Sequence, residues 1–409
     1  MPLDNFVTEL KNGIAELEAA GTAKGAEYIV TDIIKPKGEK GPRILLQGYG
    51  DKEFIRMNSN SYLGMGLREP VIKAEEAAAV KYGVGPGAVR FISGTYEPHI
   101  TLEKRLAEFH GRDACMLNSA AYSTVLGVIS TLAGPETIII SDELNHNCII
   151  NAMKLARPKA KKIYKHVNMD ELEKQIQESV GECDNLIVVT DGVFSMRGVY
   201  APLDKIVALA KKYNDKFPRD IVVVVDDSHG VGALGERGRG TEEQCGTREV
   251  DILVATLGKA LGVNGGYVVS RKEIIHYLRE KNSFYIYTNP ITPSEATAAL
   301  AALNMLDSDE GVKLLEHLHA MTERFEQGLV NLGYETLHSP HPVTPLMIRD
   351  TERTTRAVNF LREHGVLATG LNYPVVPKGD QSIRFQVCAD HTPYDIDYVL
   401  GVLEEFKTS

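Results

Sequence analysis

Several residue types and patterns are scarce in this 409-residue chain. It has no tryptophan, and its five cysteines form an odd set without any Cys-x-x-Cys pair. Such a set is typical of buried thiols in a reducing compartment, and it argues against a disulfide framework or a cysteine-ligated zinc site. We therefore expect free cysteines and no bound metal.

Long apolar runs are also missing. No stretch approaches the roughly 18 consecutive apolar residues of a membrane-spanning helix, and the amino terminus lacks the apolar core of a signal peptide. The sequence therefore predicts a cytoplasmic protein without a membrane span.

The chain, whose formal net charge is −10, has no strong basic stripe. One basic cluster at 154–165 is more simply a solvated helix end than a contact to an anionic ligand. The glycine-rich run 83–95 matches neither Gly-x-x-x-x-Gly-Lys-Ser/Thr nor Gly-x-Gly-x-x-Gly. These absences argue against a nucleic-acid partner and against nucleotide triphosphate or dinucleotide binding.

The chain is too long for one ordinary core, and its 43% hydrophobic and 24% charged residues are typical of globular proteins. We expect an amino-terminal helix and arm over 1–57, a large domain over 58–293, and a small carboxyl-terminal α+β domain over 294–409. A hairpin is predicted at 48–52, and a long helix is predicted from Ser294, as its cap, to about Leu306.

Four short apolar runs, rich in β-branched residues, alternate with helical stretches in the large domain. This pattern predicts a mostly parallel sheet covered by helices on both faces, an α/β fold. Ligands bind at the carboxyl ends of such strands. The runs are 137–141, 186–190, 221–225 and 252–256, and they are followed by the polar segments 142–146, 191–195 and 226–229 and by Lys259.

Lys259 lies between glycines just after the fourth run, in the segment 256–262 (TLGKALG). Long charged side chains avoid such places unless they are paired or reactive. An aldehyde cofactor needs an amine there, whereas a surface lysine in a glycine turn explains the segment about equally well. Thr256 and the glycines would suit a phosphate group.

Asp226 ends the third run, 33 residues before Lys259. A pyridine cofactor that withdraws electrons needs a buried carboxylate at its ring nitrogen, and His229 could reach the ring oxygen. Helix capping and magnesium binding are alternatives for Asp226, but together with Lys259 the cofactor hypothesis is favoured. His146 could stack on the ring, or could be a solvated histidine. Arg384 could clamp a substrate carboxylate, or form a surface salt bridge.

Seven segments in combination resemble the α-oxoamine synthases, which are fold-type I enzymes dependent on pyridoxal 5′-phosphate (PLP). Members condense an amino acid with an acyl-CoA thioester. The resemblance covers about residues 58–393 and rests on 60–64 (NSYLG), 90–95 (RFISGT), 144–146 (LNH), 195–203 (SMRGVYAPL), 226–232 (DDSHGVG), 238–241 (GRGT) and 256–262.

The resemblance implies a role for each candidate residue. Lys259 would bind PLP as an imine and act as general base, Asp226 would pair with the ring nitrogen, and His229 would bond the ring oxygen. His146 would stack on the ring. Ala121, Tyr122 and Thr256 would bind the phosphate, and Thr288 and Asn289 would reach the phosphate from the second subunit of a homodimer. Asn60 and Arg384 would bind the substrate carboxylate. Ser195 would contact the cofactor region.

Within the family, the segment 373–379 (YPVVPKG) most resembles glycine C-acetyltransferases, so condensation of glycine with an acyl-CoA is favoured. The alternatives are decarboxylating condensation with a longer acyl-CoA, as in 8-amino-7-oxononanoate synthase or serine palmitoyltransferase, or transamination or aldol cleavage. A silent partner subunit is disfavoured because Lys259 is present. Arg197 departs from the Asp or neutral residue usual in the family, which leaves the acyl chain open.

Overall fold

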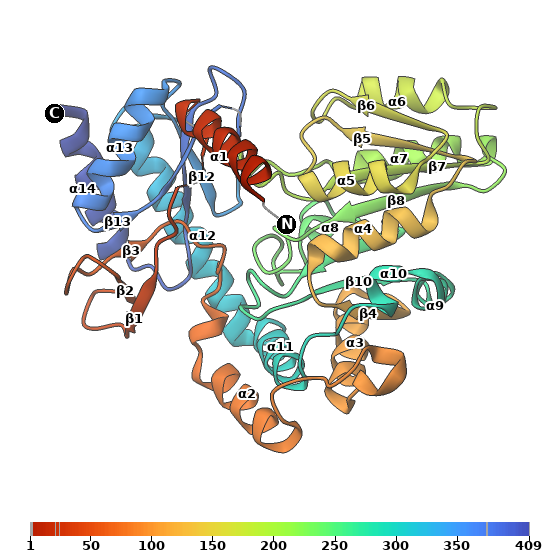
Figure 1. The fold of residues 1–409 in the computed structure, drawn as a ribbon, viewed down its shortest axis with the longest axis horizontal. Helices are drawn as coiled ribbons and strands as arrows, with labels where there is room; N and C mark the ends of the chain where they lie inside the picture. Colours follow the sequence, from red (N-terminus) through yellow and green to blue (C-terminus); the bar gives the residue numbers. More distant parts are fainter. Residues whose placement is uncertain (1–2, 21, 24, 374, 409) are drawn as a thin grey trace.

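The computed structural model describes residues 3–20, 22–23, 25–373 and 375–408. Its centre is a seven-stranded sheet in the order β4-β10-β9-β8-β7-β5-β6 (Figure 1). The strands are β4 (Ala114–Asn118), β5 (Thr137–Asp142), β6 (Ala160–Tyr164), β7 (Asn185–Asp191), β8 (Ile221–Asp226), β9 (Ile252–Thr256) and β10 (Gly266–Ser270).

The four predicted strands are β5, β7, β8 and β9, which are adjacent and parallel. The prediction of a mostly parallel sheet is therefore confirmed. Strands β4, β6 and β10 were not predicted from the sequence. Of these, β10 is antiparallel to both of its neighbours, β9 and β4, so the chain turns straight back after β9.

Helices cover both faces of this sheet, as predicted. Alternate residues of a strand point to opposite faces, so each strand has apolar side chains that pack against the helices on either face. On β9, Ile252 and Val254 pack in one apolar cluster with α4, α5, α9 and α10, whereas Leu253 and Ala255 pack in another with α3 and α11. Helices α6 and α7 lie on the same side as α3 and α11 (Figure 1). The helices of this region are α2 (Glu69–Tyr82), α3 (Glu97–His110), α4 (Ala121–Leu132), α5 (Asn147–Ala156), α6 (Met169–Gln177), α7 (Leu203–Tyr213), α8 (Thr241–Gln244), α9 (Lys272–Lys281), α10 (Ser283–Ile286) and α11 (Pro293–Leu306).

The predicted helix cap at Ser294 is wrong. Thr292 is the N-cap of α11, because its hydroxyl accepts from the backbone N–H of Glu295 while the Glu295 carboxylate accepts from the N–H of Thr292. This reciprocal capping box satisfies two helix-end donors, whereas Ser294 is already inside the first turn.

The carboxyl-terminal part is an α+β arrangement, as expected. An antiparallel sheet in the order β11-β12-β15-β14 packs with three helices. The predicted domain boundaries stay predictions. The elements are α12 (Asp309–Asn331), β11 (Glu335–Thr336), β12 (Val343–Met347), α13 (Thr351–Glu363), β13 (Val366–Leu367), β14 (Thr369–Leu371), β15 (Ser382–Gln386) and α14 (Pro393–Thr408).

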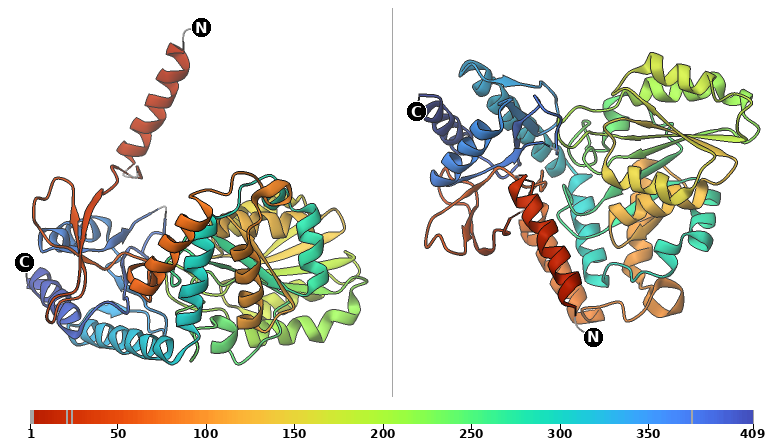
Figure 2. Two further views of the ribbon diagram at one scale, coloured as in Figure 1. Left: turned by 90° about the horizontal axis from the view of Figure 1, so that it is seen from below. Right: turned by 45° about the horizontal axis from the view of Figure 1, so that its top comes forward.

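The amino-terminal region forms a helix and an arm. Helix α1 (Asp4–Ala19) buries none of its residues and projects from the body of the molecule (Figure 2). Strands β1 (Val30–Ile34) and β2 (Arg43–Leu46) pair, and the hairpin predicted at 48–52 is confirmed by the antiparallel bridge between Ile44 and Phe54. Strand β3 (Ile55–Arg56) then pairs with β13 and joins the arm to the carboxyl-terminal part.

None of the described helices is long and apolar enough to cross a membrane. All five cysteines are free thiols, and four of them are buried. The cytoplasmic location stays a prediction.

Candidate active site

A cavity of about 270 Å³ lies where β7, β8 and β9 end, at the carboxyl edge of the sheet. It brings together eight of the predicted site residues, from segments far apart in the sequence. Its lining residues are Ala120, Ala121, Tyr122, His146, Cys148, Asp191, Val193, Ser195, Asp226, Ser228, His229, Thr256 and Lys259.

Lys259 lies in the loop that connects β9 with the reversed strand β10. Within the described chain its amine makes no hydrogen bond and no ion pair. Burial lowers the pKa of Lys259, although the nearby carboxylates of Asp226 and Asp191 act in the opposite direction. The amine is therefore uncharged, and so nucleophilic, at a lower pH than that of an ordinary lysine.

Asp226 is the last residue of β8 and is only 8% exposed. Its Oδ1 accepts hydrogen bonds from the backbone N–H of Ser228 at 3.1 Å and from the Ser228 hydroxyl at 2.5 Å. Its Oδ2 accepts from the Cys148 thiol at 3.4 Å. These donors fix the position of a carboxylate that faces the cavity. Cys148 and Ser228 were not predicted, although Ser228 lies inside the motif that suggested Asp226.

A second buried carboxylate, Asp191, pairs in register with Asp226 on the neighbouring strand. Its Oδ2 accepts from the backbone N–H of His146 at 2.8 Å. Burial, and then the charge of Asp226, raise the pKa of Asp191 well above its usual range. In the sequence, only the position of Asp191 directly after a predicted strand indicated that it belongs to the site.

His146 is the N-cap of α5, where its Nδ1 accepts from the backbone N–H of Cys148 at 3.2 Å. Its ring meets that of Tyr122 edge to face, with centroids 6.1 Å apart. Burial lowers the pKa of His146, so a neutral, flat ring lines the cavity near neutral pH.

His229 also lines the cavity, and its Nδ1 lies 2.7 Å from the hydroxyl of the fully buried Tyr62. Burial and the charge of Lys259 lower the pKa of His229 well below its usual value. The Tyr62 contact fixes the orientation of the imidazole. Tyr62 was missed as a site residue, although it lies in the 60–64 motif.

The amino-terminal end of α4, which begins at Ala121 and Tyr122, also lines the cavity. The first N–H groups of a helix lack partners within the helix, and here no side chain caps them. Gly266 allows β10 to lie very close to this helix end, because a Cβ at position 266 would be only 2.3 Å from the Ala121 nitrogen. Helix ends of this kind bind anions. The Thr256 hydroxyl, beside them in the cavity, donates to the Gly265 carbonyl at 3.1 Å.

Asn60 and Arg384 lie beside the cavity and do not line it. The Arg384 Nε donates to the Ser195 carbonyl at 2.6 Å, and its Nη2 donates to Asn60 Oδ1 at 3.3 Å. The Gln386 amide also donates to Asn60 Oδ1, at 2.6 Å. Ser195 therefore connects this group to the cavity, and Gln386 is a member of it that was not predicted.

Thr288 and Asn289 lie outside the cavity. They follow α10 and the strongly exposed Tyr287, whose exposed fraction is 77%. Their predicted contact with the phosphate of a second subunit stays a prediction.

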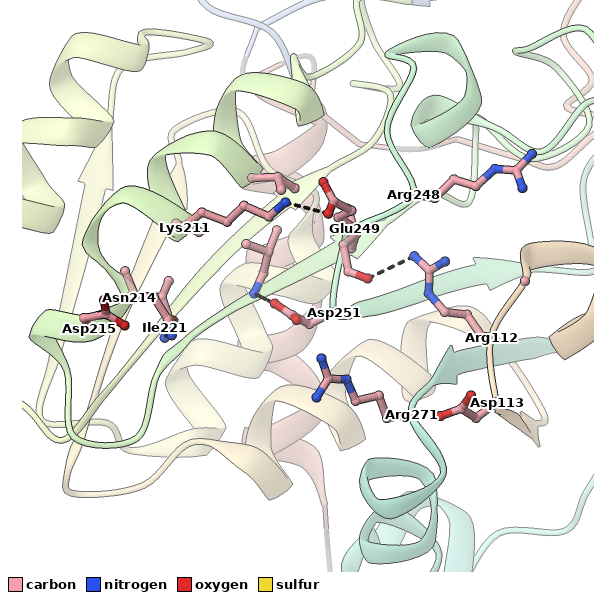
Figure 3. A pocket seen from close by; sticks show the side chains of 15 residues that line it. Arg112, Asp113, Lys211, Asn214, Asp215, Ile221, Arg248, Glu249, Asp251 and Arg271 are labelled. Atoms are coloured by element: carbon pink, nitrogen blue, oxygen red, sulfur yellow. Dashed lines mark hydrogen bonds and ion pairs between the residues drawn. The ribbon is translucent and has the colours of Figure 1, made fainter.

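A larger hollow of about 660 Å³ lies at the opposite, amino edge of the same sheet (Figure 3). There Lys211 pairs with Glu249 at 2.5 Å, and Asp251 accepts from the backbone N–H of Val223 at 2.8 Å. None of the predicted site residues lines it.

The sequence matches the family model described as aminotransferase class I and II over residues 52–403. It is 37% identical to the 8-amino-7-oxononanoate synthase of Petrotoga mobilis over 99% of both chains. It is 38% identical to the 8-amino-7-oxononanoate synthase 1 of Bacillus subtilis over 91% of this chain and 92% of that protein.

Solved structures of serine palmitoyltransferase share the fold. The Sphingomonas wittichii enzyme superposes with a TM-score of 0.89 at 28% identity, covering 100% of this chain and 98% of that one. The S. paucimobilis enzyme with bound PLP has a TM-score of 0.87 at 27% identity, covering 99% and 97%. The chain therefore belongs to the aminotransferase class I and II family and, within it, to the PLP-dependent α-oxoamine synthases of fold type I.

Proposed function

We propose that this enzyme condenses a small α-amino acid, alanine in the first instance, with an acyl thioester longer than acetyl, and that CO₂ is lost. The observation that carries the proposal is the cavity that joins Lys259, Asp226 and the free end of α4. The preference for glycine and the likeness to glycine C-acetyltransferases are not supported by the curated relatives reported above, which favour the decarboxylating alternative.

The residues of the cavity fit PLP. The uncapped end of α4 suits its phosphate, the fixed carboxylate of Asp226 suits its ring nitrogen, and the amine of Lys259 suits its aldehyde. The neutral ring of His146 offers a flat surface for stacking. When bound, PLP draws electrons away from the α-carbon of the attached amino acid.

The side chains then divide the proton transfers. Burial lowers the pKa of Lys259 and so favours the uncharged amine, which can take the proton from the α-carbon of the amino acid. The Asp226 carboxylate, whose position Ser228 and Cys148 fix, would hold a proton on the ring nitrogen. Arg384 and Asn60 form the side of the site that would bind the amino-acid carboxylate, because a guanidinium matches a carboxylate with two parallel hydrogen bonds.

The product named by the curated relatives indicates the bonds that change. In 8-amino-7-oxononanoate the amino and oxo groups stand on adjacent carbons, and the amino carbon carries a methyl group. Alanine that has lost its carboxylate supplies this amino carbon, and an acyl group supplies the oxo carbon. The α-carbon bonds to the acyl carbonyl and the carbon–sulfur bond breaks, so the thiol leaves with the proton that Lys259 removed. The bond from the α-carbon to the carboxylate then breaks as CO₂ leaves, and a proton from solvent takes its place on the α-carbon. His146, whose Nδ1 accepts the Cys148 N–H, would donate from its other ring nitrogen to the carbonyl oxygen as negative charge develops there.

The test crosses glycine, alanine and serine with acetyl-CoA and longer acyl-CoAs, and measures free thiol together with CO₂ from carboxyl-labelled amino acid. We expect alanine and a longer acyl-CoA to release CoA and CO₂ in equal amounts. Fastest turnover of glycine with acetyl-CoA, without CO₂, would restore the glycine C-acetyltransferase hypothesis. If no pair releases CoA, the assignment of the acyl acceptor and donor is wrong.

We also propose a homodimer with shared sites. Thr288 and Asn289 lie outside the cavity of their own chain, and apolar side chains of α1 such as Phe6 and Leu10 are exposed. Co-expression of Thr288→Ala with Lys259→Ala tests this proposal. In a shared-site dimer, hybrids contain one site with both substitutions and one with neither, so activity exceeds that of either variant alone. Activity no higher than that of the better variant would contradict sharing.

A further inference from the structure

A second, smaller cavity lies next to the cofactor cavity, and Ser195 lines both. Its volume is about 120 Å³, and its walls are mostly apolar side chains. The lining residues are Leu144, Phe194, Ser195, Met196, Arg197, Leu337, Pro345, Met347, Val375, Val376, Pro377, Asp380 and Ser382. A chain attached to the carbon that reacts beside Ser195 can therefore continue into an apolar space.

One wall of this cavity is a short hairpin at residues 193–200. Val193 and Tyr200 form an antiparallel bridge, and the N–H of Phe194 donates to the Val199 carbonyl at 2.8 Å. The hairpin follows β7 and carries residues 194–197 into the apolar cavity. The facing wall comes from β12 and from the segment 375–380, so the cavity forms only when the large sheet and the carboxyl-terminal part meet.

Two charged side chains line this apolar cavity, and they neutralise each other. Arg197 Nη2 lies 2.6 Å from Asp380 Oδ2, and the two side chains are 37% and 28% exposed. Beyond them, Arg349 lies 3.8 Å from Asp380 and pairs with Glu335. Each arginine therefore has an acidic partner, and no cation among the described lining residues is left unpaired.

We propose that this cavity receives the alkyl part of the acyl group, and that the Arg197–Asp380 ion pair selects acyl chains with an uncharged end. The inference rests on the proposed acyl-thioester function and narrows its substrate class. An alkyl chain gains by leaving water for apolar walls. A chain that ends in a carboxylate would stay unpaired among those walls or would have to displace Asp380 from Arg197, and both are costly.

This assignment explains the residue that departs from the family pattern. Arg197 has no contact with the cofactor cavity, and its partner Asp380 is 183 positions away in the sequence. It also separates this chain from its curated relatives, because 8-amino-7-oxononanoate carries a carboxylate at the far end of its chain.

The test compares heptanoyl-CoA with pimeloyl-CoA, which have the same chain length and differ in the terminal carboxylate. Each is assayed with alanine, and the ratio of kcat/KM values is measured on the PLP-loaded enzyme. We expect the wild-type enzyme to favour heptanoyl-CoA by about tenfold or more. Asp380→Asn keeps the size of the side chain but leaves Arg197 as a free cation, so the ratio should shift towards pimeloyl-CoA by at least about tenfold.

Two further variants make the result specific. Glu335→Gln removes an acid from the same group of charges outside the cavity, and its ratio should stay within twofold of wild type. Arg197→Met in the Asp380→Asn background should abolish the shift, because the cation that lines the cavity is gone and Arg349, outside it, stays paired with Glu335. Retained PLP absorbance shows that each variant has folded.

The outcomes distinguish the two proposals. Release of CoA with heptanoyl-CoA and an unchanged ratio in Asp380→Asn would overturn the cavity assignment and leave the proposed function standing. A wild-type preference for pimeloyl-CoA would also overturn it. If the wild-type enzyme releases CoA from neither thioester and from no other, the proposed function fails and the cavity assignment fails with it.

Discussion

The two edges of the central sheet carry two different kinds of hollow. The amino edge has the larger one, about 660 Å³, in which Lys211 has an acidic partner and Asp251 accepts a backbone N–H (Figure 3). Arg248 and Arg271 also line it; they have no hydrogen-bond or ion-pair partner among the described residues, but they are exposed to water. The carboxyl edge has about 270 Å³, with an unpaired lysine among buried groups. The state of the ionisable groups, rather than the volume, therefore identifies the site, because an unpaired amine among buried groups destabilises the fold unless it has a function.

Replacing one lysine at each edge tests this comparison most strongly. Lys259→Ala should lower turnover by about 10³-fold or more, because both the amine that binds the aldehyde and the base are lost. It should also abolish the visible absorbance of the bound cofactor. Lys211→Ala is the matched control and should change neither property by more than twofold. Equal losses in both variants would show that the comparison is wrong.

Replacing one aspartate at each edge should give a smaller contrast. Asp226→Asn cannot hold a proton on the ring nitrogen, so kcat/KM should fall by about 10²-fold or more while folding is retained. Asp251→Asn keeps an oxygen for the Val223 N–H, so its kcat/KM should stay within twofold of wild type. Steady-state kinetics on both variants decide, and a twofold effect or less in Asp226→Asn would contradict the proposed role.

The pH dependence of cofactor capture should show the smallest effect. Burial lowers the pKa of Lys259 from the usual value of 10.5. The unprotonated amine reacts with the aldehyde, so the rate of PLP uptake by the apoenzyme should rise with pH and reach half of its maximum below pH 10.5. Stopped-flow absorbance measures this rate. A midpoint at pH 10.5 or above would mean that the amine is as basic as an exposed lysine.

Much of the fold could be predicted from the sequence because strand and site signals are local. The apolar runs at 137–141, 186–190, 221–225 and 252–256 fell within strands, and the polar residues after three of them line one cavity. Strand β10 was missed because its short apolar run, Tyr267 to Val269, follows two glycines that are more typical of a loop, and its antiparallel direction cannot be seen in an apolar run. The cap of α11 was misplaced because Thr292 and Ser294 are both good caps, and only the reciprocal bond to Glu295 distinguishes them.

The rest of the site depends on contacts between distant residues, which no local pattern reveals. The Cys148 thiol reaches Asp226 across 78 positions, and Tyr62 reaches His229 across 167. A cysteine or tyrosine in such a place is more often part of a core. The Arg197–Asp380 pair is similar: the unusual arginine was visible in the sequence, but its partner was not.

The hairpin at 193–200 suggests how substrate range can change in such an enzyme. Ser195 holds Arg384 with its backbone carbonyl, which any residue would supply, while the side chains of Met196 and Arg197 line the apolar cavity. Substitutions at these two positions can therefore change which acyl chain the enzyme accepts without affecting the contacts that bind the amino acid. Enzymes that share one chemistry can then come to make different products through few substitutions, and these substitutions can be confined to a single hairpin.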